Sequence, residues 1–160
     1  MSDEIPPPSE LKTRVLDEED CQTVSDIIAH FASQAILLWR TPEDVRKHMD
    51  CFLIGEIDGQ PVGCVALQDY GQGLYELRSL AVKQDFWGKG LGSQLIHAAV
   101  DLGKVRNANR IFALTKRPGL FLRNGFVVTQ MDEFPQKVWN DCKLCPKREN
   151  CVEVAVKMDL

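Results

Sequence analysis

The stretch Tyr75–Gly92, YELRSLAVKQDFWGKGLG, decides the fold of this chain. Its first part becomes more apolar towards Val82 and is typical of a strand. The glycines that follow, among them Gly88 and Gly90, lead into an amphipathic pattern that predicts a helix. A glycine-rich turn at a helix N-terminus presents unpaired backbone N–H groups and the positive end of the helix dipole. The stretch therefore indicates a phosphate-bearing cofactor at residues 88–93.

Two common phosphate motifs do not fit this stretch. A P-loop needs Gly-Lys followed by Ser or Thr, but Lys89 is followed by Gly90. The dinucleotide fingerprint G-x-G-x-x-G is missed because its third glycine, Gly92, comes one residue early. Taken alone, G-x-G-x-G leaves a flexible start of a helix as an equal alternative to phosphate binding.

The flanking sequence predicts an α+β domain. Asp17 is expected to cap the first helix, Asp58-Gly59 is a strong hairpin signal, and Gly125 is expected to end a short helix. Beyond the opening stretch, the predicted elements are strands at 11–16, 51–57, 60–68, 110–115, 126–129 and 152–158, and helices at 17–33, 41–50 and 118–124.

Composition excludes several classes of protein. At 160 residues the chain is expected to be one domain over residues 11–160, preceded by a disordered, acidic and proline-rich tail at residues 1–10. The net charge of −4 argues against a nucleic-acid partner. Neither a signal-like segment nor an apolar run of membrane-spanning length is present in the sequence, so we expect no membrane association and a cytoplasmic location.

The ordered combination of L-A-V, a short turn, W-G-K-G-L-G and an amphipathic helix resembles the GNAT acetyltransferase superfamily, from about Leu11 to Val128. The resemblance implies a mixed, mostly antiparallel sheet of about six to seven strands flanked by about four helices. It also implies acetyl-CoA as cosubstrate, bound by a loop of pattern [Q/R]-x-x-G-x-[G/A]. That pattern maps onto Trp87–Gly92, with Trp87 in place of the usual Gln or Arg.

The resemblance also implies the residues that contact the cofactor. Backbone N–H groups near Leu80–Val82 would polarise the thioester carbonyl and hold the pantetheine arm. Many family members carry a tyrosine as general acid at the position of Phe121, so here the proton for the thiolate must come from water or another residue; we interpret Phe121 as a core aromatic. The expected cofactor contacts are Leu80, Ala81, Val82, Trp87, Gly88, Lys89, Gly90, Leu91, Gly92, Ser93 and Phe121.

Transfer to an amine needs a base, because an aliphatic amine is mostly ammonium at neutral pH. Glu76 lies on the strand where several GNAT enzymes place their general-base glutamate, so it is the candidate catalytic residue. The alternative is a surface carboxylate paired with Arg78. On a regular strand Glu76 and Arg78 point to one face, unless a bulge intervenes.

Four strings are similar to the acetyltransferase domain of N-acetylglutamate synthases: LLWRTPED, YELRSLAV, LTKRPGLFLRNGF and FPQKVW. This resemblance implies direct acetyl transfer to the α-amine of L-glutamate, as in arginine biosynthesis. It is to a short, stand-alone form, since the usual amino-acid-kinase-like domain is absent from the sequence. Dicarboxylates are normally held by cations, and the candidates for substrate binding are Arg40, Arg78, Lys116 and Arg117. Each can equally be a solvated surface charge.

Other functions stay open at this point. The acceptor can be another small amine or a protein lysine, and the chain can instead be a non-catalytic acyl-CoA-binding regulatory module. A homodimer is plausible for a GNAT domain. Cys142, Cys145 and Cys151, in the C-terminal segment 135–151, have a spacing that suits a structural zinc or a redox pair. The remaining cysteines, Cys21, Cys51 and Cys64, are expected in the core, and His97 is expected to be exposed and idle.

Overall fold

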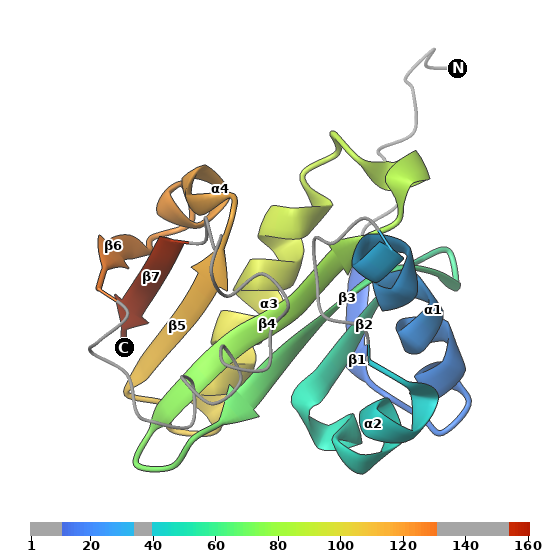
Figure 1. Cartoon of the computed structure of the whole chain (residues 1–160), viewed down its shortest axis with the longest axis horizontal. Coiled ribbons are helices and arrows are strands. Elements are labelled where there is room, and N and C mark those ends of the chain that lie inside the picture. The colour runs from blue at the N-terminus through green and yellow to red at the C-terminus, as the bar shows by residue number, and fades with distance from the viewer. Residues whose placement is uncertain (1–10, 34–39, 131–153) are drawn as a thin grey trace, which may run out of the picture.

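The computed structural model describes residues 11–33, 40–130 and 154–160. Their strands form one seven-stranded sheet in the order β1-β2-β3-β4-β5-β7-β6 (Figure 1). Only β4 and β5 run parallel. The elements are β1 Lys12–Val15, α1 Asp20–Ser33, α2 Pro42–Lys47, β2 Phe52–Ile57, β3 Gln60–Asp69, β4 Leu74–Val82, α3 Leu91–Val105, β5 Arg110–Thr115, α4 Pro118–Leu122, β6 Val127–Thr129 and β7 Val154–Asp159. The prediction of an α+β fold with a mostly antiparallel sheet is confirmed.

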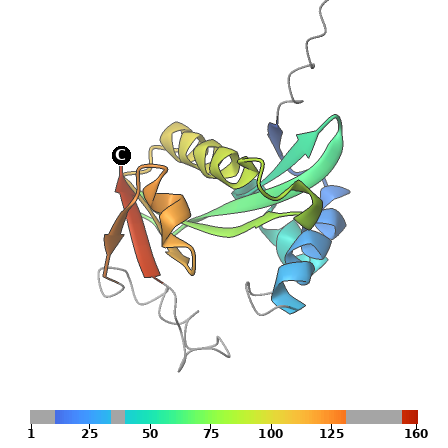
Figure 2. The ribbon, with the colours of Figure 1, turned by 90° about the horizontal axis from the view of Figure 1, so that it is seen from above.

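The helices cover both faces of the sheet, α1 and α2 on one side and α3 on the other (Figure 2). Two apolar clusters result. The first joins α3 and α4 to the sheet through residues such as Leu95, Ile96 and Phe121. The second joins α1 and α2 to the opposite face through residues such as Val24 and Val45. None of the helices in the described part of the chain is long and apolar enough to cross a membrane.

Three helices are shorter than predicted, and the smallest difference is at α4, which ends at Leu122 rather than at Asn124. The first helix begins at Asp20 rather than at Asp17, because the Asp20 carboxylate accepts a hydrogen bond from the Asp17 backbone N–H at 2.7 Å and closes a turn ahead of the helix. The second helix ends at Lys47 instead of near Asp50, and a separate 3₁₀ turn over Met49–Cys51 leads into β2. Thr41 caps the second helix and forms a capping box with Asp44.

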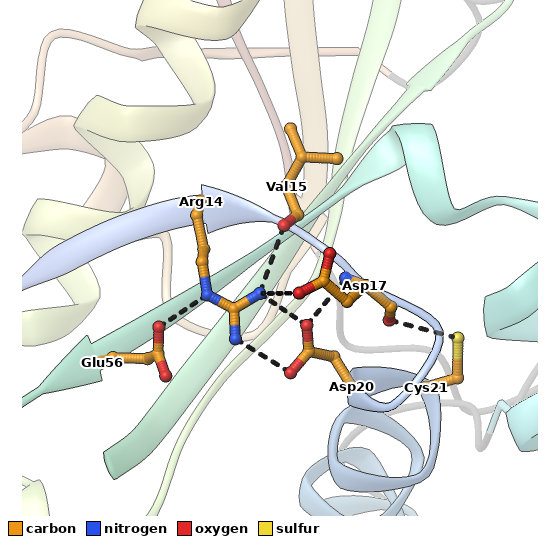
Figure 3. Close-up of polar contacts among 6 residues, drawn as sticks. All are labelled: Arg14, Val15, Asp17, Asp20, Cys21 and Glu56. Carbon is orange, nitrogen blue, oxygen red and sulfur yellow. Dashed lines mark hydrogen bonds and ion pairs between the residues drawn. The ribbon is translucent and has the colours of Figure 1, made fainter. Parts of the chain in front are cut away.

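Arg14 joins three elements on the α1 side of the sheet (Figure 3). Its Nε donates to Glu56 of β2 at 2.7 Å, and its two terminal nitrogens donate to both carboxylate oxygens of Asp20 at the start of α1. The Asp20 side chain is 12% exposed, so this charge is largely removed from water. The hydrogen bond from Arg14 is the main reason that the pKa of Asp20 is lowered from its ordinary value.

A bulge interrupts the ladder between β3 and β4. Cys64 pairs with Ala81, but Ala66 pairs with Arg78, so β4 holds one more residue than β3 in this interval. Ser79 lies in the interval with φ 54°, a left-handed conformation that is uncommon for a residue other than glycine.

This extra residue reverses the alternation of side chains along β4. Before the bulge, Arg78 faces α1 and α2; after it, Ala81 faces them as well. Leu80 and Val82 instead face α3, together with Leu77. The bulge thereby directs Leu80 and Val82 to the α3 side, the face opposite to Arg78.

The parallel pairing of β4 with β5 is short. Ladder pairs join Leu74, Tyr75 and Glu76 to Arg110, Ile111 and Phe112, and none follows in the described residues. Figure 1 shows the two strands diverging beyond this point. The C-terminal half of β4, which carries Leu80–Val82, is therefore paired with β3 on one edge only among the described strands.

Candidate active site

A pocket of about 280 Å³ opens on the α1 and α2 side of the sheet, where β3 and β4 meet α2. It contains two guanidinium groups, one carboxylate, one imidazole, one phenol and one thiol. The lining residues are Arg40, Asp44, His48, Cys51, Phe52, Ala66, Gln68, Tyr70, Arg78 and Ser79.

Glu76 lies directly behind this pocket. The Tyr70 hydroxyl donates a hydrogen bond to its Oε1 at 2.8 Å, and a terminal nitrogen of Arg78 lies 3.5 Å from the same oxygen. The Glu76 side chain is only 10% exposed. Glu76 and Arg78 therefore share one face, as predicted, and the alternative of an exposed surface carboxylate is excluded.

The four predicted substrate-binding cations divide into two pairs. Arg40 and Arg78 both line the pocket, and the Arg40 backbone is held by a 2.6 Å hydrogen bond from Ser25 Oγ to its carbonyl oxygen. Lys116 and Arg117 are exposed, lie between β5 and α4, and are not among the lining residues. The structure thus brings only Arg40 and Arg78 together.

The predicted cofactor loop precedes α3. Gly88 and Gly90 have φ values of 78° and 76°, and Gly90 caps the helix in the left-handed conformation. A Cβ at either position would meet no atom within 4 Å, so the surroundings are open to a ligand. The α3 N-terminus with its unpaired N–H groups suits a pyrophosphate.

Trp87 anchors the start of this loop. Its indole N–H donates to the carbonyl oxygen of Val82 at the end of β4, at 2.7 Å. Lys89 lies with its ammonium 5.3 Å from the centre of the Phe86 ring. The two side chains attach the loop to neighbouring residues and leave the glycine backbone at Gly88 and Gly90 exposed.

The remaining predicted cofactor residues lie on β4, α3 and α4. Leu80 and Val82 are half-buried and pack against the α3 side of the core, whereas Leu91 and Ala81 are buried. Phe121 is 4% exposed and makes an edge-to-face contact with Phe126 at 5.2 Å, which confirms its interpretation as a core aromatic. Its contact with a cofactor stays a prediction.

Asn124 connects α3 with the end of α4. Its amide nitrogen donates to Ser93 Oγ at 3.0 Å and to the Leu120 carbonyl at 2.7 Å. Its amide oxygen lies 2.7 Å from His97 Nε2. His97 is exposed, as expected, and its hydrogen bond with Asn124 helps to hold the two helices together.

The cysteines of the described residues are poor nucleophiles. Cys21 and Cys64 are buried, as expected, whereas Cys51 is half-buried; it packs against the apolar cluster on the α1 side and also lines the pocket. Cys51 is the last residue of the 3₁₀ turn that precedes β2, and it lines the pocket from there. Burial raises the pKa of Cys51 to about 11 and that of Cys64 to about 12, so both thiols stay protonated near neutral pH.

The predicted zinc or redox cysteines Cys142, Cys145 and Cys151 lie outside the described residues, as does the tail at residues 1–10. Within residues 11–33, 40–130 and 154–160, three or more potential metal ligands do not gather at any point.

Several pocket residues were not identified from the sequence, namely Asp44, His48, Gln68 and Tyr70. Asp44 lies in the first turn of the predicted helix at 41–50, where it forms part of the capping box. His48 and Tyr70 lie in connecting segments that folding brings together, and their spacing along the chain carries no signal. Gln68 is the one exception in principle, since it alternates with Ala66 on β3 and pairs with Glu76.

Comparisons with known proteins show the family to which the chain belongs. Residues 14–126 match the Acetyltransferase (GNAT) family. The match spans more than half of the chain, which therefore belongs to the GNAT family of acetyltransferases. An uncharacterized N-acetyltransferase of Chlorobaculum tepidum is 37% identical over 86% of this chain and 88% of its own length.

Two further relatives have more specific names. The amino-acid acetyltransferase of Shewanella oneidensis is 32% identical over 74% of this chain, which spans only 27% of that protein. The structure of N-acetylglutamate synthase from Neisseria gonorrhoeae, complexed with coenzyme A and N-acetyl-glutamate, superposes with a TM-score of 0.83 and 26% identity. The superposition covers 95% of this chain and 35% of the synthase chain. Rv2747 from Mycobacterium tuberculosis, at 22% identity and a TM-score of 0.80, shows the same fold.

Proposed function

We propose that this protein transfers the acetyl group of acetyl-CoA to the α-amine of L-glutamate. The observation that carries the proposal is the pocket itself, which Arg40 and Arg78 both line, with Arg78 3.5 Å from the buried carboxylate of Glu76. Two guanidinium groups suit the two carboxylates of the acceptor, because each can form paired hydrogen bonds with a carboxylate. The similarity to an N-acetylglutamate synthase that was crystallised with CoA and N-acetyl-glutamate supports the same acceptor.

The proposed mechanism is direct attack within a ternary complex. The glycine loop before α3 holds the pyrophosphate of acetyl-CoA, and the backbone N–H groups near Leu80–Val82 polarise the thioester carbonyl. Glu76 removes the proton from the acceptor ammonium, and the free amine attacks the carbonyl carbon. The protonated state of Cys51 supports direct transfer over an acyl-cysteine intermediate at this thiol.

The size of the pocket supports a small acceptor. About 280 Å³ accommodates an amino acid, and the lining is rich in polar and charged side chains. A lysine in a protein would bring its neighbouring backbone to the same place, where Arg40 and Arg78 would find no carboxylate to pair with. Other small anionic amines are the natural competitors of glutamate.

The test is the release of CoA from acetyl-CoA with L-glutamate, other amino acids and a lysine peptide as acceptors. Product is detected by mass, because the cysteines of the protein interfere with thiol reagents. Glu76→Gln should lower kcat by about 100-fold or more while acetyl-CoA affinity stays unchanged, which is the usual contribution of a general base. Glu19→Gln removes an exposed carboxylate and serves as the matched control.

The outcomes separate the candidate functions. Turnover that depends on glutamate and is lost in Glu76→Gln supports the proposal. Turnover with a different amine keeps the mechanism but changes the substrate. Acetyl-CoA binding without turnover on any acceptor would instead identify a non-catalytic acyl-CoA-binding module.

A further inference from the structure

Tyr70 lines the pocket, whereas Glu76 is not among the lining residues. The Tyr70 hydroxyl donates a 2.8 Å hydrogen bond to Glu76 Oε1. An acceptor amine in the pocket would therefore meet the Tyr70 side chain before it meets the Glu76 carboxylate. We propose that the Tyr70 hydroxyl relays the proton of the acceptor ammonium to Glu76. This inference rests on the proposed amine acetylation, but not on glutamate as the acceptor.

The position of the phenol is fixed from two sides. The Tyr70 backbone N–H donates to the Leu74 carbonyl at 2.9 Å and closes the turn between β3 and β4. Its ring packs on Phe112 of β5 at a centroid distance of 5.9 Å. The hydroxyl therefore does not depend on the ligand to find Glu76, and the relay is already in place before an acceptor binds.

The chemistry of the relay balances without a further reactant. A phenol donates one proton and accepts through its oxygen lone pairs. The ammonium N–H bond breaks as its proton moves to the phenol oxygen, and the phenol O–H bond breaks as its proton moves to Glu76 Oε1. Tyr70 ends unchanged, Glu76 ends as a neutral carboxylic acid, and the acceptor ends as a free amine ready to attack the thioester.

The other pocket groups are less suited to this step. Arg40 and Arg78 carry guanidinium groups, which donate hydrogen bonds and have no acceptor atom for a proton. The Cys51 thiol is protonated near neutral pH. Asp44 is engaged in the capping box of α2. His48 is the one competing group among the lining residues, because its imidazole can itself act as a base.

The experiment compares Tyr70→Phe with wild type over a range of pH, using whichever acceptor the wild type turns over. Tyr70→Phe keeps the ring packed on Phe112 and removes only the hydroxyl. We expect kcat/KM at neutral pH to fall about 10-fold or more, since a positioned proton acceptor contributes at least this much. The difference in kcat/KM between Tyr70→Phe and wild type should shrink as the pH rises above the pKa of the acceptor ammonium, because the amine is then already free.

Two controls sharpen the comparison. Tyr75→Phe removes the hydroxyl of the only other tyrosine, which lies in the cluster on the α3 side of the sheet, and should leave kcat/KM within about 2-fold of wild type, because its side chain faces away from that of Glu76. His48→Gln measures the contribution of the competing base. Acetyl-CoA affinity is measured for every variant and should not change.

Three results would overturn the relay. A Tyr70→Phe variant as fast as wild type would show that the amine reaches Glu76 without the phenol. A loss of the same size at every pH would assign Tyr70 a structural role. A larger and pH-dependent loss in His48→Gln would move the proton transfer to His48. In each case the wild-type turnover still supports the proposed function, whereas a wild type inactive on every amine would overturn both.

Discussion

Arg40 and Arg78 are the residues whose charge should decide acceptor binding. Replacing either with Gln should raise the KM for the acceptor by about 10-fold or more, since a charge-assisted hydrogen bond contributes about 1.5–3 kcal/mol. The KM for acetyl-CoA should stay the same, because neither residue belongs to the glycine loop. Steady-state kinetics with each substrate varied in turn checks this. Lys104→Gln, which removes an exposed cation from the last turn of α3, is the control.

Equal effects on both KM values would contradict this assignment and indicate a general loss of structure. Arg78→Gln carries a second expectation, because Arg78 also lies 3.5 Å from Glu76. Loss of this neighbouring cation removes a group that favours the charged carboxylate. We therefore expect Arg78→Gln to lower kcat as well, whereas Arg40→Gln should act mainly through KM.

For single residues, the sequence predicts the side-chain positions that strand alternation determines. Glu76 and Arg78 are two residues apart, so their shared face follows from the period of a strand. Arg40 could be named from the family resemblance. Tyr70 could not, because its hydroxyl reaches Glu76 only after the turn between β3 and β4 has formed. Side chains in connecting segments have no periodicity from which their neighbours can be inferred.

Among the elements, the loop before α3 offers the clearest test of cofactor binding. Gly90→Ala introduces no steric clash, but φ 76° is unfavourable for alanine and costs about 1–2 kcal/mol. We expect a lower free energy of unfolding and weaker CoA binding by calorimetry. Gly59→Ala in the hairpin between β2 and β3 is a matched control, since Gly59 has φ 79° and an equally open Cβ site.

The control should lose similar stability and bind CoA as tightly as wild type. If Gly59→Ala weakened CoA binding as much as Gly90→Ala, the glycine loop would not be the cofactor site. If Gly90→Ala bound CoA normally despite its lower stability, the backbone at Gly90 would not contact the cofactor.

The elements themselves followed well from the sequence where turn residues mark their ends. The strand at Arg110–Thr115 agrees with its prediction, and the hairpin at Asp58-Gly59 has positive φ at both residues, as this dipeptide favours. The start of α1 did not follow, because two aspartates compete for the turn. The bulge of β4 did not follow either, since a serine rather than a glycine adopts the left-handed conformation there.

For the molecule as a whole, Arg14 connects the N-terminal strand to the rest of the fold. Arg14→Met should destabilise the protein by about 2 kcal/mol, because it leaves the carboxylates of Asp20 and Glu56 without their shared partner. This corresponds to a fall in Tm of about 4–8 °C for a chain of this size. Thermal unfolding followed by circular dichroism measures it.

The effect should depend on pH in a defined direction. The pKa of Asp20 is lowered in the folded state, so its stabilising contribution is present above the ordinary value of 3.8 and is lost as the pH falls through the lower, folded value. The difference in Tm between wild type and Arg14→Met should therefore narrow in acid. Arg110→Met removes an ion pair with the exposed Asp159 and should have a smaller effect. A difference that stays constant down to acid pH would contradict this role for Asp20.

The bulge at Ser79 shifts the alternation of side chains along β4 by one residue. Side chains before and after the bulge alternate with opposite phase, so β4 directs Glu76 and Arg78 towards the pocket side of the sheet and Leu80 and Val82 towards the α3 side. Deleting Ser79 would restore a single phase and exchange inward and outward positions over the rest of the strand. A sequence alignment of this strand, or a transfer of the pocket to another scaffold, must therefore include the extra residue when positions along β4 are matched.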